Sequence, residues 1–146
     1  MTASATSKPQ VVVSLTSFPQ AIPYAVGAIR SILNGSVLPD RLVLYLTFSQ
    51  FGDAGLPEEL TSLSRENPVF EIRNYDRDLR SYLKLIPALA DFPDAIIVTI
   101  DDDIDYHRHM LRDLLAMLAP DPPAVRAPRV RRINPGVHYG RRTKYN

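Results

Sequence analysis

Three consecutive carboxylates, Asp101, Asp102 and Asp103, directly follow the apolar, β-branched run Ile96–Ile100. Such a run predicts a strand that is buried on both faces, as in the centre of a parallel sheet. Because side chains alternate along a strand, Asp101 and Asp103 are expected on one side and Asp102 on the other. Clustered carboxylates repel one another, and a divalent cation relieves that repulsion. Ligands of open α/β sheets bind at the carboxyl edge of the strands, so the acidic run predicts a metal–nucleotide site.

The expected cation is Mg²⁺ or Mn²⁺, because these hard ions are typically held by one or two carboxylates together with water and substrate phosphates. Asp101 and Asp103 supply that minimal ligand set. With a diphosphate bound, the ion would neutralise its charge and stabilise it as a leaving group. The alternative interpretation is a solvated acidic turn whose carboxylates cap a following helix. The position at the tip of a predicted buried strand favours the metal site.

Hydrophobic periodicity and breaker residues predict alternating strands and helices around these acids. Pro87 should kink or split the third predicted helix, and residues 50–55 are expected to form a loop. The third strand is expected to be half exposed. Strands are predicted at 11–15, 41–48, 69–75, 96–100 and 125–133, and helices at 22–33, 56–66, 80–92 and 110–118.

This alternation predicts one α/β domain with a Rossmann-like, mostly parallel sheet and helices on both faces. The length of 146 residues suits a single domain, which we expect at 11–135 after a short disordered lead at 1–10. The first predicted strand is not followed by a glycine-rich dinucleotide fingerprint, and the sequence contains no P-loop. A bound nucleotide is therefore not expected to be held by a glycine loop.

Composition excludes several classes of function and site. The sequence has no cysteine, which excludes disulfides, thiolate zinc sites and cysteine nucleophiles and fits a reducing compartment. No apolar run approaches the roughly 20 residues of a membrane span. Residues 1–10 lack the apolar core of a signal peptide. We therefore expect a cytoplasmic protein.

The net charge of +1 conceals a basic C-terminal end. Residues 123–146 hold seven Arg or Lys and no acid, whereas residues 1–122 hold ten basic against 16 acidic residues, a net charge of −6. The basic tail at 136–146 and the residues before it suggest three roles: a segment facing donor phosphates, a patch for a membrane surface or lipid-linked acceptor, or the exposed end of a truncated protein. The spacing of these arginines does not resemble a recognition helix, so nucleic acid binding is not expected.

Three motifs occur in an order and spacing that resemble the GT-A fold glycosyltransferases, specifically a bacterial group. They are Val13-Ser14-Leu15-Thr16-Ser17-Phe18-Pro19, Lys84-Leu85-Ile86-Pro87-Ala88-Leu89 and Thr99-Ile100-Asp101-Asp102-Asp103. The resemblance covers roughly residues 10–135. It implies transfer of a sugar from a nucleotide-sugar donor to a glycan or lipid-linked acceptor, with a metal bridging the acids and the donor diphosphate.

Carried over by position, the resemblance assigns the metal to Asp103 directly. Asp101 would contact the ribose or reach the metal through water, and Asp102 would assist in binding the nucleotide sugar.

The resemblance places four further residues in the nucleotide pocket. Thr16 and Ser17 would lie against the nucleoside, and Asp78 and Lys84 would complete the pocket. Each has a plainer interpretation: Thr16 and Ser17 as turn residues, Asp78 as a helix-capping acid, and Lys84 as a solvated helix lysine.

The chain ends at Asn146, where GT-A enzymes continue into an acceptor-binding half. We therefore expect a truncated protein, or one completed by another chain, and His138 is the one titratable candidate for a catalytic base after Asp121. Two rival functions stay open. One is a metal-dependent nucleotidyltransferase, and the other is a catalytically inactive module that binds nucleotide sugars.

Overall fold

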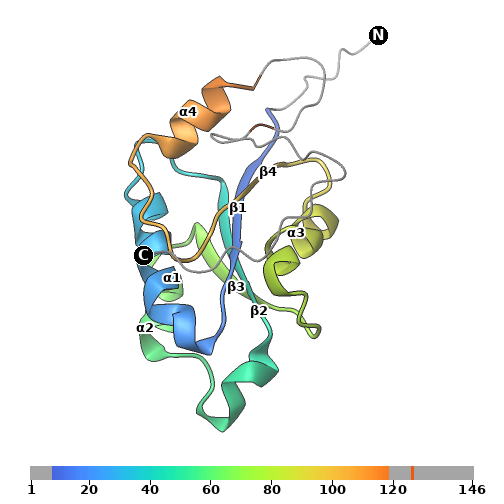
Figure 1. Ribbon diagram of the computed structural model, residues 1–146. Coiled ribbons are helices and arrows are strands. Elements are labelled where there is room, and N and C mark those ends of the chain that lie inside the picture. The colour runs from blue at the N-terminus through green and yellow to red at the C-terminus, as the bar shows by residue number, and fades with distance from the viewer. Residues whose placement is uncertain (1–7, 119–125, 127–146) are drawn as a thin grey trace, which may run out of the picture.

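A computed structural model describes residues 8–118 and 126 as a parallel sheet with helices on both faces (Figure 1). All of the predicted strand at 125–133 except residue 126, the whole predicted tail at 136–146 and most of the predicted lead lie outside these residues. Within the described part of the chain, no helix is long and apolar enough to cross a membrane. The elements, with η for 3₁₀-helices, are β1 (Val11–Thr16), η1 (Pro19–Ala21), α1 (Ile22–Leu33), β2 (Arg41–Leu46), η2 (Phe48–Ala54), α2 (Glu58–Glu66), β3 (Phe70–Asn74), η3 (Arg80–Lys84), α3 (Ile86–Asp91), β4 (Ile96–Thr99) and α4 (Met110–Ala116).

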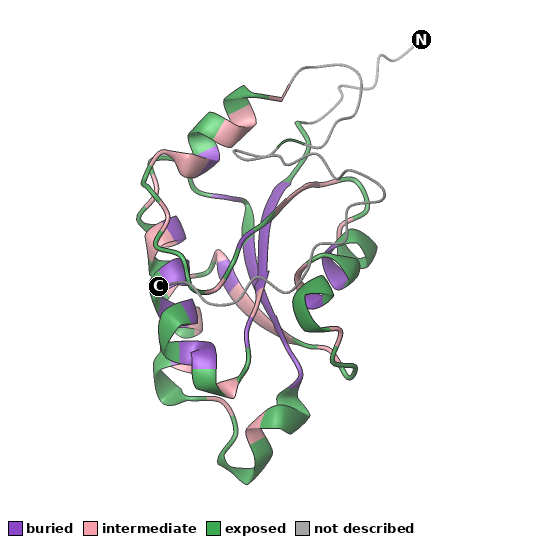
Figure 2. Cartoon of the chain, in the orientation of Figure 1, coloured by how far each residue is buried: buried purple, intermediate pink, exposed green. Residues whose placement is uncertain are grey.

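The strands run parallel in the order β3-β2-β1-β4, which confirms the predicted Rossmann-like α/β class. Alternate residues of β1 reach the two faces of the sheet. Val13 and Leu15 join Val26 and Ile29 of α1 and Leu60 of α2 in one apolar cluster. On the opposite face, Val12 packs with residues that include Leu83 of η3 and Ala88 of α3. The central strands are accordingly the most deeply buried part of the chain (Figure 2).

The expectation that the acid-tipped strand is buried on both faces is wrong for the described residues. Within them β4 is the last strand of the sheet, with β1 as its neighbour. Ile96, Ile97 and Val98 are half-buried, and Thr99 is exposed. An apolar run shows which side chains a strand carries. It does not show how many other strands pair with that strand, and burial on both faces depends on this number.

The predicted helix at 80–92 is split, as Pro87 suggested, into η3 and α3. Pro87 lies in the first turn of α3, where its missing N–H costs nothing. By contrast, residues 50–55 are not an open loop, because η2 covers most of them. Polar residues and two glycines at 50–55 resemble a loop in sequence, and short 3₁₀ turns need no hydrophobic period. The third strand is half-buried as expected.

The α3 side of the sheet is fastened by a buried tyrosine. Tyr45 of β2 is only 1% exposed, and its hydroxyl donates a 2.7 Å hydrogen bond to Asp91 Oδ2 at the end of α3. Arg73 of β3 donates to the same oxygen at 2.7 Å. Burial and the hydrogen bond to Asp91 raise the pKa of Tyr45. Since α3 follows η3 directly, this contact also fixes the position of η3 above the sheet.

Candidate nucleotide and metal site

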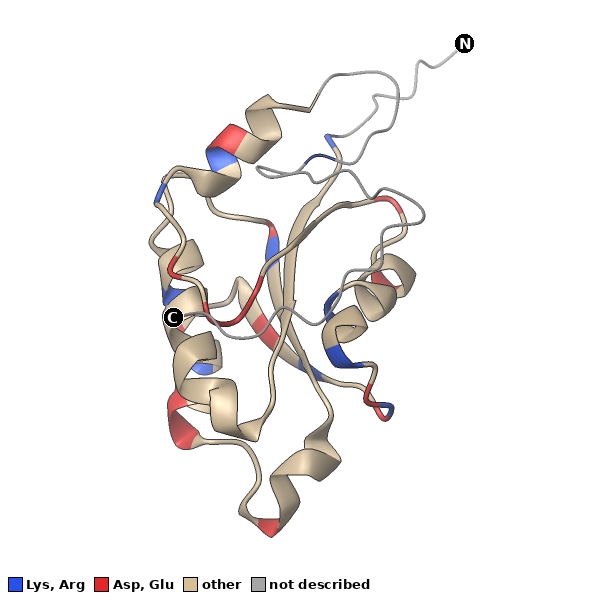
Figure 3. Cartoon of the chain, in the orientation of Figure 1, with Lys and Arg blue, Asp and Glu red and all other residues tan. Residues whose placement is uncertain are grey.

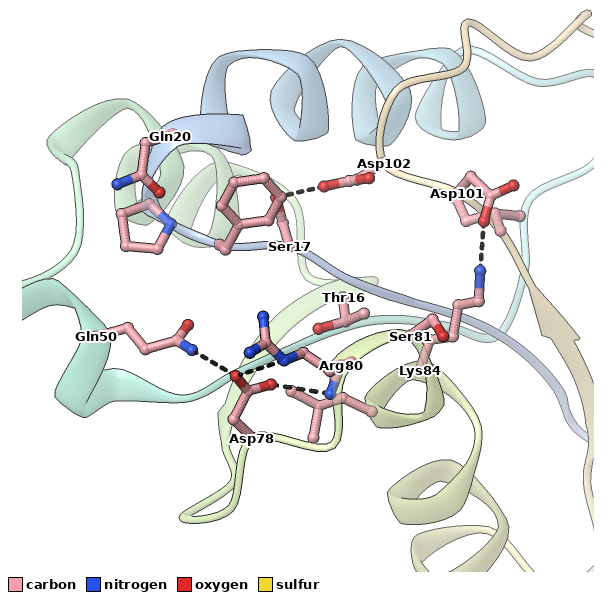
Figure 4. Close-up of a pocket in the computed structure, with 14 residues that line it drawn as sticks. Thr16, Ser17, Gln20, Gln50, Asp78, Arg80, Ser81, Lys84, Asp101 and Asp102 are labelled. Carbon is pink, nitrogen blue, oxygen red and sulfur yellow. Dashed lines mark hydrogen bonds and ion pairs between the residues drawn. The ribbon is translucent and has the colours of Figure 1, made fainter. Parts of the chain in front are cut away.

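A cavity of about 620 Å³ lies at the carboxyl edge of the sheet, between the ends of β1 and β4 and the segment 78–84 (Figure 4). Its volume falls in the range of about 300–1,000 Å³ typical of small-molecule sites. Six of the seven residues predicted from the sequence line it: Thr16, Ser17, Asp78, Lys84, Asp101 and Asp102. These six come from three segments that are far apart in the sequence. The acids that follow β4 lie together at this edge (Figure 3).

Strand register brings Ser17 to Asp102. Because β1 pairs with β4 in parallel, with Ser14 beside Thr99, the residues three places further along each chain meet beyond the strand ends. Ser17 is 7% exposed, and its Oγ donates a 2.6 Å hydrogen bond to Asp102 Oδ2. Thr16 Oγ1 instead donates to the carbonyl of Tyr45 on β2 at 2.9 Å. Both residues therefore line the cavity with hydroxyls that donate to other groups of the protein.

Lys84 and Asp101 form an ion pair across the cavity. Ser14 Oγ donates a 2.6 Å hydrogen bond to the carbonyl of Lys84, so the end of η3 is tied to the middle of β1. The Lys84 side chain is only 21% exposed, against 56% for Asp101. Lys84 is thus not the solvated helix lysine of the plainer interpretation, because a buried anchor and a carboxylate hold it in place.

The turn after β4 is held by Tyr106. Asp101 N donates a 2.8 Å hydrogen bond to the Tyr106 hydroxyl, and Tyr106 N donates to Ser31 Oγ of α1 at 3.0 Å. Burial raises the pKa of Tyr106, and the neighbouring carboxylates act in the same direction. The backbone that carries the acids is therefore fixed to α1 through a neutral tyrosine.

The expected alternation of the three acids does not hold. Regular strand geometry ends at Thr99, and residues 102 and 103 form a turn. As a result Asp101 and Asp102 both line the cavity, whereas the exposed Asp103 is not among the residues that line it. Among the described residues, no three His, Asp or Glu side chains converge as a ready-made metal site. Strand periodicity applies only while the chain keeps strand geometry, and here that geometry ends at Thr99, before the acids.

Asp78 both lines the cavity and holds a turn. Its Oδ1 accepts a 2.8 Å hydrogen bond from the backbone N–H of Arg80, the first residue of η3. Its Oδ2 accepts a 3.1 Å hydrogen bond from Gln50 Nε2. The capping interpretation and the predicted place in the pocket are thus compatible, because different oxygens of one carboxylate face the turn and η2.

Several residues that line the cavity were not predicted from the sequence, among them Phe18, Gln20, Gln50, Arg80 and Ser81. Arg80 and Ser81 lie between the predicted site residues Asp78 and Lys84, so their position in the sequence could have indicated that they line the cavity. Gln50 carried no such signal, since η2 brings it to the cavity from a segment expected to be a loop.

Comparison with protein-family models and with curated proteins found no match to this chain. The chemistry of the site is therefore argued from its own residues and their arrangement.

Proposed function

We propose that this cavity binds a nucleotide-diphosphate sugar together with Mg²⁺ or Mn²⁺, and that the chain is a GT-A type glycosyltransferase or its donor-binding half. The observation that carries the proposal is the convergence of Thr16, Ser17, Asp78, Lys84, Asp101 and Asp102 on one cavity at the carboxyl edge of a parallel sheet. This is the edge at which open α/β sheets bind their ligands. The sequence and its resemblance predict all six as site residues.

The charge of the cavity supports a metal ion as part of the ligand. Three carboxylates line it, those of Asp78, Asp101 and Asp102, against two cations, those of Arg80 and Lys84. Their net charge is −1, so a dianionic diphosphate would meet a lining of its own sign. A divalent cation bound with the diphosphate cancels that repulsion.

Asp101 supplies an oxygen donor of the kind such an ion prefers. Asp101 presents a carboxylate on the cavity wall, and oxygen ligands are those that Mg²⁺ and Mn²⁺ prefer. We propose Asp101 and Asp103 as the ligands, with Asp103 assigned from the resemblance and adjacent in the chain to the residues that line the cavity. When bound, the ion would stabilise the negative charge of the departing diphosphate.

Within this proposal the protein's own residues have separate tasks. Ser17 orients Asp102 through their hydrogen bond. Lys84 neutralises Asp101 while no cation is present, and its ammonium becomes available to a phosphate once a metal takes over that carboxylate. Ligand binding would therefore move Lys84 from Asp101 to a phosphate and Asp101 from Lys84 to the metal. Neither the ammonium nor the carboxylate would be left unpaired.

Calorimetric titration with nucleoside diphosphates tests the proposal. We expect Mn²⁺ or Mg²⁺ to tighten binding strongly over that in chelator, and Asp103→Ala to abolish this metal-dependent part of the affinity. Asp105→Ala, which removes an equally exposed acid two residues away, is the matched control. Unchanged affinity in chelator, or in Asp103→Ala, would contradict the proposal.

Product analysis separates the rival functions. A glycosyltransferase releases a nucleoside diphosphate from a nucleotide sugar, even if only by slow hydrolysis. A nucleotidyltransferase releases pyrophosphate from a nucleoside triphosphate. Metal-dependent donor binding with neither product would indicate an inactive binding module.

A further inference from the structure

Arg80 has an unusual backbone conformation. Among the described residues it is the one non-glycine residue with a positive φ, at 54°. This left-handed region is sterically disfavoured for a residue that has a Cβ atom. Such conformations persist where surrounding contacts impose them, and they concentrate at ligand-binding sites. Arg80 also lines the cavity, so its strained backbone lies at the candidate site.

Asp78 contacts Arg80 at two points. Its Oδ1 accepts the hydrogen bond from Arg80 N at 2.8 Å, and its Oδ2 lies 3.4 Å from Arg80 Nε. One carboxylate therefore contacts both the backbone and the side chain of Arg80. Gln50 Nε2 donates to that carboxylate at 3.1 Å and so fixes it from the other side of the cavity. The three residues form a connected unit (Figure 4).

The Arg80 side chain is the more available of the two cations in the cavity. It is 89% exposed, whereas the Lys84 side chain is 21% exposed and paired with Asp101. The contact between the Arg80 guanidinium and Asp78 is made through Nε, and Arg80 lines the cavity, so its two outer nitrogens can serve a ligand there (Figure 4). Arginine presents these nitrogens as a planar fork that matches a phosphate group.

We propose that Arg80 is an anion-binding residue of this cavity, that its outer nitrogens donate to a phosphate oxygen of a diphosphate ligand, and that Asp78 is its positioning residue. The identification of the diphosphate as part of a nucleotide sugar rests on the proposed function. The role of Arg80 itself rests on its strained backbone, its exposed guanidinium and its place in the cavity. Lys84 then completes the diphosphate contacts after it leaves Asp101.

Arg80→Gly is the decisive variant, because glycine adopts a positive φ without strain and removes only the side chain. We expect it to unfold at the same temperature as the wild type or higher. It should nevertheless bind inorganic pyrophosphate and a nucleoside diphosphate about 10- to 100-fold more weakly in calorimetry, the range for loss of a charged hydrogen bond. Its affinity for the corresponding nucleoside should not change. Arg77→Gly removes an exposed arginine from the same segment that does not line the cavity, and it is the matched control.

The positioning role of Asp78 is tested with a double-mutant cycle. Asp78→Ala should change the pyrophosphate affinity of the wild type and have no further effect in the Arg80→Gly background. Equal effects in both backgrounds would show that Asp78 acts independently of Arg80 and would overturn its assignment.

Other outcomes separate the two proposals. If Arg80→Gly binds pyrophosphate as well as the wild type does, or weakens nucleoside binding as much as diphosphate binding, the assignment of Arg80 is wrong. If the wild type binds pyrophosphate through Arg80 but binds no nucleotide, the assignment stands and the proposed function fails. If neither ligand binds, both proposals are overturned.

Discussion

Asp101→Asn should change nucleotide affinity in opposite directions with and without metal. The substitution keeps the size of the side chain and leaves the hydrogen bond from the backbone N–H of residue 101 to Tyr106 in place. It removes a negative charge that is 56% exposed and paired with Lys84. Because the Lys84 side chain is only 21% exposed, the loss of stability should exceed the roughly 0–1 kcal/mol of a fully exposed ion pair, and urea unfolding of the wild type and the variant measures it separately. A change in binding can then be assigned to the site.

The magnitude follows from the charge of the cavity. Without metal, the variant raises the net charge of the lining from −1 to zero and frees Lys84 for the ligand. Removing one unit of repulsion is worth about 1 kcal/mol at 4 Å in water, which corresponds to roughly fivefold tighter binding of a nucleoside diphosphate. With metal, the same change removes a carboxylate ligand. Groups that only support a metal ligand already account for about 10- to 100-fold in metal affinity, so binding should weaken at least tenfold.

The assay is calorimetry of one nucleoside diphosphate in Mn²⁺ and in chelator, for the wild type and Asp101→Asn. Asp105→Asn makes the same charge change at an exposed position that does not line the cavity, and it should leave both affinities nearly unchanged. A loss of affinity of equal size in both buffers would refute the reasoning. It would show that Asp101 serves as a direct hydrogen-bond acceptor for the nucleotide.

Two further predictions concern the fold that carries the site. Burial and Asp91 raise the pKa of Tyr45, so its contribution to stability is present below the unfolded-state pKa of about 10 and is lost as the pH rises above it. Tyr45→Phe should therefore lower the free energy of unfolding by about 1 kcal/mol at pH 7 and make it fall less at alkaline pH. Urea unfolding between pH 7 and 11 measures both effects. An equal fall with pH in the wild type and the variant would contradict this prediction. Leu44→Ala, at a fully buried position of β2, should cost about 2–5 kcal/mol, whereas Leu89→Ala, at a 52% exposed position of α3, should cost far less in the same assay.

Much of the fold could be predicted from local patterns. The spacing of Val26, Ile29 and Leu33 encodes a helix, and Pro87 encodes the break between η3 and α3, because periodicity and backbone sterics act within a few residues. The alternation of these elements then restricts the sheet to a mostly parallel arrangement. The same local information failed at η2, where no hydrophobic period marks a short 3₁₀-helix.

The candidate site was also predicted only in part from the sequence. Residue types alone identified Asp101 and Asp102 as candidates, because clustered carboxylates repel one another when no cation is bound. Ser17 and Lys84 were expected at the site only from the resemblance. Their contacts could not be predicted, since the distance between Ser17 and Asp102 depends on the register of β1 against β4. Nor could the sequence show that β4 ends before the acids and that Asp103 does not line the cavity.

The sequence by itself determined which groups are present: three acids after an apolar strand, a lysine before a proline-split helix, and no glycine loop for phosphate. Only the tertiary structure decided which of these groups meet. It paired Lys84 with Asp101, and it added Arg80 and Gln50 to the cavity around Asp78. The physical reason is that side-chain chemistry is a property of each residue, whereas distance and backbone strain arise when segments far apart in the chain pack together.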